Sequence, residues 1–271
     1  MYSNRVEDTI SQLDETIAED ESPTAPSWLW SLLEAPRALA EAGSLLSARA
    51  MLRNLPAGDG HAVMTLPGFL ASDRSMKTVR TYLRDWDYDA HRWEMGRNLG
   101  LSRTTDIEAM LDQRLQEIHE QSGGKVSLIG WSLGGMFARE LARRNPDWVR
   151  SVITLGSPIG DPRGTNAWRL FEIISGMNID HEYIRRRVEK LREPIHDIPM
   201  TAIYSKSDAI VSAEIAKLPP GTNVENIGVA ASHFGMGYNP AVFFAIADRL
   251  RQTEGEWQPF EINGLRKFFF H

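Results

Sequence analysis

A serine held between two glycines, in the segment Gly-Trp-Ser-Leu-Gly at residues 130–134, constrains this sequence more than any other feature. It follows a short apolar run, 126–129, and precedes a stretch with helical spacing. A chain that turns from strand to helix within so few residues strains the serine backbone, and side chains two positions away on either side would collide with the turn. The hydroxyl is then exposed beside the positive end of the helix, which predicts a nucleophile at Ser132. A plain turn in which Ser132 only caps the helix is the alternative.

Short apolar runs alternate with amphipathic segments along most of the chain. The runs predicted as strands are 61–66, 88–92, 126–129, 151–155, 200–204 and 224–229. The segments predicted as helices are 75–84, 105–119, 133–144 and one that starts at Asn239-Pro240. Apolar strands separated by helices are typical of a parallel sheet covered on both faces. We therefore predict an α/β fold with a shortened, mostly parallel sheet of about six strands.

Local signals support two of these helices. Thr105 and Glu108 have the spacing of a capping box at the start of one helix. In the last helix proline occupies the first helical position, and its inward residues are predicted to be Phe243, Ile246 and Leu250.

Two regions depart from the alternation. Residues 1–58 contain a polar arm, to about residue 25, and a helical stretch, 27–53, that we expect to be interrupted at Pro36. We predict that these N-terminal helices pack on the outside of an α/β domain spanning residues 59–271.

The second departure is the stretch from about 159 to 199, which holds a Gly/Pro turn and two helical pieces, 166–175 and 181–191. It lies between two predicted strands. An insertion there would form a small helical cap above the carboxyl ends of the strands, where ligands bind in open α/β sheets.

A nucleophilic serine needs a base and an acid that orients the base, and after a Gly-x-Ser-x-Gly turn they follow in the order acid, histidine. The histidines beyond Ser132 are His181, His196, His233 and His271. Only His233 follows the last predicted strand and precedes the last helix, so we predict it as the base. A surface loop histidine without a role is the alternative.

The acid is expected directly after the strand 200–204. Asp208 lies there, ahead of an apolar run, whereas Asp197 precedes the strand and Glu225 lies within the next one. We predict Asp208 as the acid; its alternative role is helix capping ahead of Val211.

Two backbone N–H groups must bind the oxyanion of an acyl-transfer intermediate. One should come from Leu133, directly after the nucleophile. The other should come from the turn after the first strand, with Phe69 as the preferred donor and Leu70 second. A plain strand-ending turn is the alternative.

Residues near this centre are candidates for substrate contact. They are Leu70, Trp131, Trp168 and Phe171, with Trp93 or Asn98 as further candidates from the loop 91–100. Apolar walls of this kind favour an apolar acyl or alcohol group, although many such residues serve only to pack a cap on the core.

These segments resemble α/β-hydrolase esterases and lipases. The likeness covers roughly residues 60–250 and rests on Leu-Pro-Gly-Phe-Leu at 66–70, Ile-Gly-Trp-Ser-Leu-Gly-Gly at 129–135, Ile-Tyr-Ser-Lys-Ser-Asp at 203–208 and Ser232-His233. The resemblance implies carboxylic-ester hydrolysis through an acyl-enzyme, without a cofactor. The oxyanion turn begins Pro-Gly where many members have His-Gly, and the usual antiparallel hairpin at the start of the sheet is not predicted.

Composition narrows the remaining possibilities. The chain has no cysteine, which excludes a Cys nucleophile and thiolate metal sites, and we predict no metal. A net charge of −6 without a basic stripe argues against a nucleic-acid partner. The longest apolar stretch, Trp28 to Leu33, is too short to cross a bilayer, and no secretory leader is predicted, so we expect a cytoplasmic protein.

The apolar stretch from Trp28 to Leu33 could contact a membrane surface, a second subunit or the core of the protein itself, and we favour the core. The apolar tail Phe268-Phe269-Phe270 is likewise expected to be tucked in. Together the residues predict a serine hydrolase that cleaves small-molecule or lipid-like carboxylic esters. The alternatives are a thioesterase or acyltransferase with the same triad, and a non-catalytic binding protein that retains the fold.

Overall fold

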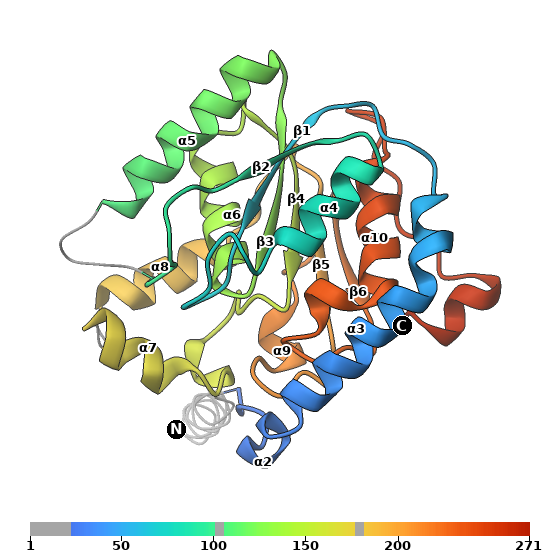
Figure 1. Ribbon diagram of the computed structural model, residues 1–271. Coiled ribbons are helices and arrows are strands. Elements are labelled where there is room, and N and C mark those ends of the chain that lie inside the picture. Colours follow the sequence, from blue (N-terminus) through green and yellow to red (C-terminus); the bar gives the residue numbers. More distant parts are fainter. Residues whose placement is uncertain (1–22, 101–105, 177–181) are drawn as a thin grey trace, which may run out of the picture.

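A single parallel sheet organises the chain in the computed structural model, which describes residues 23–100, 106–176 and 182–271 (Figure 1). Its strand order is β2-β1-β3-β4-β5-β6, and every pair of neighbours is parallel. The strands are β1 Ala62–Leu66, β2 Asp89–Arg92, β3 Val126–Trp131, β4 Val149–Leu155, β5 Met200–Tyr204 and β6 Val224–Gly228. The predicted α/β fold with a shortened parallel sheet of about six strands is confirmed.

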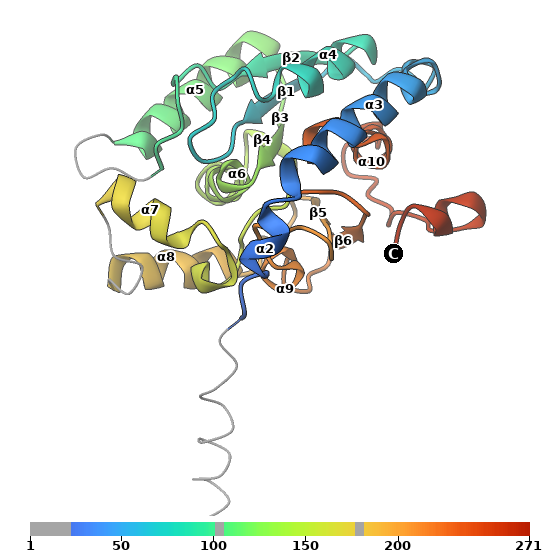
Figure 2. The same ribbon diagram turned by 60° about the horizontal axis from the view of Figure 1, so that its bottom comes forward.

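Helices cover both faces of the sheet (Figure 2). One face is covered by α3 Glu34–Arg53, α4 Lys77–Asp85 and α10 Pro240–Leu250, and the other by α5 Ile107–Ser122, α6 Leu133–Arg144 and α8 Glu182–Arg192. Shorter elements are α2 Trp28–Ser31, η1 Pro162–Gly164, α7 Trp168–Ser175, α9 Ala213–Ala216, η2 Met236–Tyr238 and η3 Gly264–Phe268.

Alternation along the strands divides the core into two layers. On β3, Leu128 packs in the layer with α5 and α6, whereas Ile129 packs in the layer with α3, α4 and α10. Because successive side chains of a strand point to opposite faces, a strand covered on both sides is buried at every position and is mostly apolar. This explains why β1 and β3 are buried throughout.

The first residues of α10 and α5 test the predicted helix starts. Helix α10 begins at Pro240, as predicted, and the Asn239 side chain accepts a hydrogen bond from the Ala241 N–H. Helix α5 is capped by Asp106, whose side chain accepts from the Ala109 N–H; the predicted cap residue Thr105 lies outside the described residues.

The predicted interruption of the N-terminal helical stretch lies at Leu32 and Leu33, between α2 and α3, and not at Pro36 itself. Helix α3 starts at Glu34, so the proline falls in the first turn. Backbone N–H groups of a first helical turn have no partner within the helix, and a proline there removes nothing that the helix needs.

The chain between β4 and β5 forms η1, α7 and α8 beside the carboxyl ends of the strands (Figures 1 and 2). Ile184 of α8 is buried in the layer with α5 and α6, and Phe171 of α7 packs against that layer. The division of the chain into N-terminal helices, α/β domain and cap remains a prediction.

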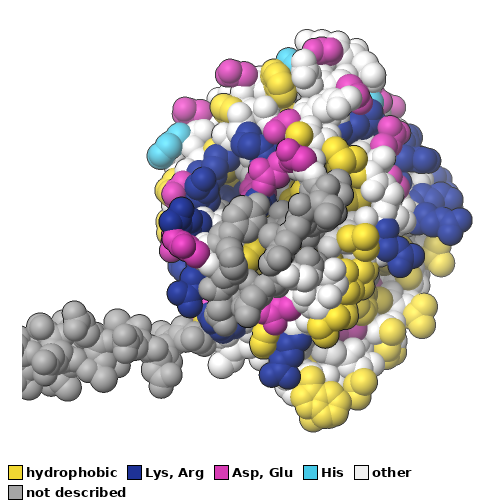
Figure 3. Space-filling model, turned by 90° about the vertical axis from the view of Figure 1, so that its left-hand side faces the viewer, with side chains coloured by type: hydrophobic (Ala, Val, Ile, Leu, Met, Phe, Trp, Pro, Cys, Tyr) yellow, Lys and Arg dark blue, Asp and Glu magenta, His cyan; other side chains and the backbone are white. Residues whose placement is uncertain are grey.

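Two apolar segments lie at the surface, contrary to the expectation that they pack inward. In the first, Trp28 is 67% exposed and Leu32 68%. In the second, Phe268 is 81% exposed and Phe269 61%, and only Phe270 is buried. On the side of the molecule that carries α5, α7 and α8, hydrophobic side chains form a band that reaches the lower edge (Figure 3). None of the helices in the described part of the chain is long and apolar enough to cross a membrane.

Candidate active site

Ser132 occupies a sharp turn between β3 and α6. Its φ of 52° and ψ of −123° are unusual for a residue with a side chain and cost of order 1–3 kcal/mol. Backbone bonds hold the turn: the Ser132 N–H donates to the Leu155 carbonyl at the end of β4, and the Ser132 carbonyl accepts from the Gly135 N–H. The surrounding sheet thus fixes a strained serine at the start of a helix.

The two glycines that flank this turn are required by space. A Cβ at Gly130 would lie 2.3 Å from the Gly134 carbonyl oxygen, which is a collision within the turn, as predicted. A Cβ at Gly134 would lie 2.3 Å from the Leu66 carbonyl oxygen instead. The second glycine therefore lets α6 approach the end of β1, which the sequence pattern alone did not indicate.

Asp208 and His233 meet in loops that follow β5 and β6. We call residues 205–211 the acid loop and residues 230–239 the histidine loop. His233 Nδ1 lies 2.8 Å from Asp208 Oδ2, and both residues are almost completely buried. The other carboxylate oxygen of Asp208 accepts N–H bonds from Ile210 and Val211, each at 2.8 Å. Asp208 therefore closes a turn within the acid loop and also contacts the imidazole, but it caps no helix, because α9 begins at Ala213 and its N-cap residue is Ser212.

The pKa of His233 is raised from its ordinary value of 6.5 by the balance of opposing influences. Burial by itself lowers the pKa, because it disfavours the charged imidazolium. The negative charge of Asp208, its hydrogen bond to Nδ1 and the charge of Glu34 raise the pKa and outweigh burial. The site thus stabilises the imidazolium that forms when His233 accepts a proton.

Ser132 and His233 are connected through their neighbours. The Trp131 indole N–H donates to the His233 carbonyl oxygen at 3.1 Å, which ties the residue before Ser132 to the histidine loop. Within the described residues Ser132 Oγ makes no hydrogen bond, and the side chain is partly exposed. Catalytic hydrogen bonds are often long without substrate and shorten in the complex.

The turn after β1 brings backbone N–H groups near Ser132. A Cβ at Gly68 would lie 3.2 Å from the Ser132 Cβ, so only glycine allows this approach without displacement. The Leu70 N–H donates to the Asn98 carbonyl at 2.7 Å and is therefore occupied. This leaves Phe69 as the better of the two predicted donors, together with Leu133 at the start of α6, where helix N–H groups have no partner within the helix.

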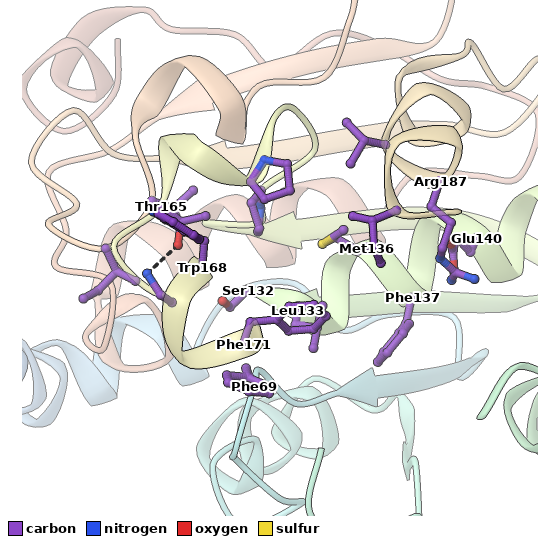
Figure 4. Close-up of a pocket in the computed structure, with 17 residues that line it drawn as sticks. Phe69, Ser132, Leu133, Met136, Phe137, Glu140, Thr165, Trp168, Phe171 and Arg187 are labelled. Carbon is purple, nitrogen blue, oxygen red and sulfur yellow. Dashed lines mark hydrogen bonds and ion pairs between the residues drawn. The ribbon is translucent and has the colours of Figure 1, made fainter. Parts of the chain in front are cut away.

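A cavity of about 100 Å³ opens beside Ser132 and extends between α6, α7 and α8 (Figure 4). Phe69, Leu133 and Phe171 surround the serine hydroxyl, and the Phe69 and Phe171 rings lie 5.6 Å apart. The remaining lining residues are Met136, Phe137, Glu140, Pro158, Pro162, Thr165, Ala167, Trp168, Ile184, Arg187, Val188, Ile210 and Val211. Most of the wall is apolar, which suits an apolar substrate group.

An ion pair lies at the end of the cavity away from Ser132 (Figure 4). Arg187 of α8 binds both Glu140 of α6 and Glu108 of α5. Burial raises the pKa of Glu140, and the charge of Arg187 opposes this rise. The two ion pairs of Arg187 join α5, α6 and α8 at this end of the cavity.

Four predicted contact residues do not line this cavity. Trp131 is buried on the opposite face of the sheet, where its ring packs against Tyr238. Leu70, in the turn after β1, adopts a φ of 60° and does not line the cavity. Trp93 is buried in the core, and the Asn98 side chain donates to the Pro67 carbonyl at 2.8 Å, so Asn98 fixes the turn rather than the substrate.

Trp168 and Phe171 do line the cavity. Two pairs of helix residues that were not predicted also line it. Met136 and Glu140 lie four residues apart on α6, and Ile184 and Val188 four apart on α8. Residues at this spacing share one face of a helix. The signal was present in the sequence, but it does not tell a cavity wall from a packed core. Across the described ranges no group of three or more His, Asp or Glu side chains is arranged to hold a metal ion.

Comparisons with known proteins agree with this architecture. A family model described as alpha/beta hydrolase fold matches residues 41–181, more than half of the chain. In sequence, the Biotin biosynthesis bifunctional protein BioHC of Teredinibacter turnerae is 29% identical over 110 residues. That match covers 32% of this chain and only 18% of the relative.

Solved lipases share the fold at low sequence identity. The Bacillus licheniformis lipase BlEst2 superposes with a TM-score of 0.53 and 20% identity, over 73% of this chain and 95% of that protein. Aspergillus fumigatus lipase B gives a TM-score of 0.53 and 19% identity, over 76% and 58%. A parallel sheet with a strained serine after β3, together with the family match, places this chain in the α/β-hydrolase family.

Proposed function

We propose that this protein hydrolyses carboxylic esters that carry an apolar acyl or alcohol group, with Ser132, His233 and Asp208 as its catalytic residues. The observation that supports this most is the 2.8 Å contact between His233 Nδ1 and Asp208 Oδ2, made at the same sheet edge as the strained Ser132. A buried carboxylate in this position fixes the tautomer of the imidazole, so that Nε2 is free to accept a proton.

The reaction proceeds in two halves. Ser132 Oγ attacks the ester carbonyl carbon while its proton passes to His233 Nε2, and the resulting oxyanion is bound by the Phe69 and Leu133 N–H groups. The carbon–oxygen bond to the alcohol breaks, and the alcohol leaves with the proton from Nε2. Water then attacks the acyl-serine, gives a proton to Nε2 and releases the carboxylic acid, and the Ser132 hydroxyl regains its proton.

The cavity supports the choice of an apolar substrate. It begins at the Ser132 hydroxyl and is lined by Phe69, Leu133 and Phe171 at that end. An acyl chain or alcohol group placed there would remove apolar surface from water, at about 25 cal/mol per Å². A panel of esters of graded acyl length measures how much of the cavity the substrate fills.

A fluorophosphonate probe tests the nucleophile. We expect one covalent adduct, located by mass spectrometry on Ser132, and we expect Ser132→Ala to lower turnover of a chromogenic short-chain ester by about 10³-fold or more. Ser127→Ala is the matched control, because Ser127 lies on β3, the strand that leads to Ser132, and also contacts a histidine, His61. Full turnover by Ser132→Ala would exclude this mechanism. Faster turnover of thiol esters than of matched oxygen esters would identify a thioesterase instead.

A further inference from the structure

Helix α3 inserts a carboxylate between the acid loop and the histidine loop. Glu34, in the first turn of the helix, is 0% exposed. One of its oxygens accepts the Ala209 N–H and the other accepts the Phe234 N–H, both at 3.0 Å. These N–H groups belong to the residues that directly follow Asp208 and His233. A single side chain therefore bridges the two loops immediately after each of their catalytic residues.

Two further residues extend this contact along the same face of α3. The Arg37 guanidinium donates to the backbone carbonyl and the side-chain oxygen of Ser207, in the acid loop. Glu41 accepts the Ser232 N–H at 2.7 Å and the Ser232 hydroxyl at 3.2 Å, in the histidine loop. We call Glu34, Arg37 and Glu41 the α3 clamp.

Docking a helix does not require a charge at this position. Burying an ionised carboxylate is costly even after relaxation of the protein. At Glu34 two N–H bonds and the Arg37 guanidinium, 3.7 Å from one oxygen, offset part of this cost. An apolar side chain would avoid that cost but would leave the Ala209 and Phe234 N–H groups without this acceptor, so the carboxylate is what connects both loops to the helix.

We propose that Glu34 is a positioning residue for ester hydrolysis: its carboxylate joins the acid loop to the histidine loop and so holds the His233 imidazole against Asp208. This inference rests on the proposed function of the triad. The negative charge of Glu34 also acts on His233. Burial lowers the pKa of His233, and the charges of Asp208 and Glu34 are among the influences that raise it. The other charged groups of α3 near this point are Glu41, and Arg37, which opposes Glu34.

Glu34→Gln tests the proposal, because glutamine has the shape of glutamate but lacks the charge and one acceptor. Its single carbonyl oxygen can accept from Ala209 or from Phe234, not from both. We expect kcat for a chromogenic ester to fall by about ten- to a hundredfold with little change in KM, as small misplacements of catalytic groups do. We also expect the acid limb of the pH profile of kcat/KM to move to lower pH, because a negative charge near the imidazolium has been removed.

Leu52→Ala is the matched control for loosening the helix. Leu52 is completely buried in α3 but lies near the far end of the helix from the two loops. We expect it to lower the melting temperature and to leave the midpoint of the acid limb in place. If Leu52→Ala moves that midpoint as far as Glu34→Gln does, Glu34 acts only through helix docking and the proposal is wrong.

Glu34→Asp separates bridging from charge and serves if the glutamine variant does not fold. The aspartate keeps the charge, but one methylene fewer prevents it from reaching both loops. We expect a reduced kcat with a nearly unchanged acid limb; unchanged kcat would overturn the proposal.

Fluorophosphonate labelling distinguishes a failure of the Glu34 inference from a failure of the proposed function. If native Ser132 reacts and the Glu34→Gln variant reacts at the same rate with the same pH dependence, the inference fails while the proposed function stands. If native Ser132 does not react, the proposed function itself fails.

Discussion

The contact between Asp208 and His233 allows a quantitative test through Asp208→Asn. Asparagine keeps an oxygen that can accept the Ile210 and Val211 N–H bonds, so the acid loop retains its shape. The amide nitrogen then faces His233 Nδ1. A donor there makes Nδ1 the acceptor and moves the imidazole proton to Nε2, which can no longer take the proton of Ser132.

The size of the effect follows from the distance. Opposite unit charges 2.8 Å apart, at an effective dielectric constant of about 20, attract by about 6 kcal/mol. Solvent screens this pair little, because both side chains are at most 5% exposed. The attraction develops only when His233 becomes charged, which occurs in the transition state. At 1.36 kcal/mol for each factor of ten, its loss lowers kcat/KM by about 10⁴-fold.

The assay is kcat/KM for a chromogenic short-chain ester at a pH on the plateau of the native profile, with thermal unfolding to confirm the fold. Asp106→Asn is the matched control, because Asp106 caps α5 through one N–H bond and asparagine caps a helix equally well. If Asp208→Asn stays within tenfold of the native enzyme, Asp208 does not orient the base and the proposed triad is incorrect.

Two further predictions concern the histidine and the turn. Since Asp208 raises the pKa of His233 against the effect of burial, kcat/KM should fall as the pH drops through a midpoint above 6.5, where the base becomes protonated; a pH–rate profile with a midpoint below 6.5 contradicts this. Gly134→Ala should abolish fluorophosphonate labelling and lower the melting temperature, because its Cβ would lie 2.3 Å from the Leu66 carbonyl oxygen and overpacking of this kind costs about 1–3 kcal/mol or more. The control Gly43→Ala, on α3 with open space around the new Cβ, should instead stabilise the helix by up to about 1 kcal/mol.

The sheet was predictable because its physical cause is local. A strand buried on both faces is mostly apolar, and β5 has the predicted bounds of Met200 and Tyr204. Phe243, Ile246 and Leu250 of α10 are all buried, as their helical spacing predicted. The order of strands and the meeting of their ends at one edge then bring the loops that carry Asp208 and His233 together.

Predictions of substrate contact were less successful, and Trp131 shows why. It is adjacent to Ser132 in sequence, which suggested a place in the cavity. However, it is the last residue of β3 and alternates with Gly130, so its ring lies on the face covered by α10. Leu133, one residue after the turn, lies on the other face and lines the cavity. Counting the alternation to the end of the strand would have placed Trp131 correctly.

The α3 clamp and the exposed apolar segments could not be predicted for a different reason. Glu34 lies in the first turn of a helix, where a carboxylate is ordinarily solvated, and its burial depends on loops more than 170 residues away. Trp28 and Leu32 were expected inside because apolar side chains gain by burial. Their sequence does not show whether the folded domain has an apolar surface against which they can pack.

A second array of the same residue types shows that geometry, not composition, selects the nucleophile. His61 contacts Asp59 through Nδ1 and Ser127 Oγ through Nε2, the latter at 2.8 Å. Burial lowers the pKa of His61, which keeps a neutral imidazole beside the serine. Yet Ser127 is 1% exposed near the start of β3, and its hydroxyl also contacts Ser151.

Ser127 therefore has an acid and a base beside it, but a substrate cannot reach its hydroxyl. It lies in a regular strand, so no strained turn presents its oxygen, and it does not line the cavity beside Ser132. Ser132 lies five residues later on the same chain segment, at the end where the strand turns into α6 and the cavity opens. A triad of this kind becomes reactive only where a turn removes the serine from the strand, and this is why a fluorophosphonate is expected to react with Ser132 and leave Ser127 unmodified.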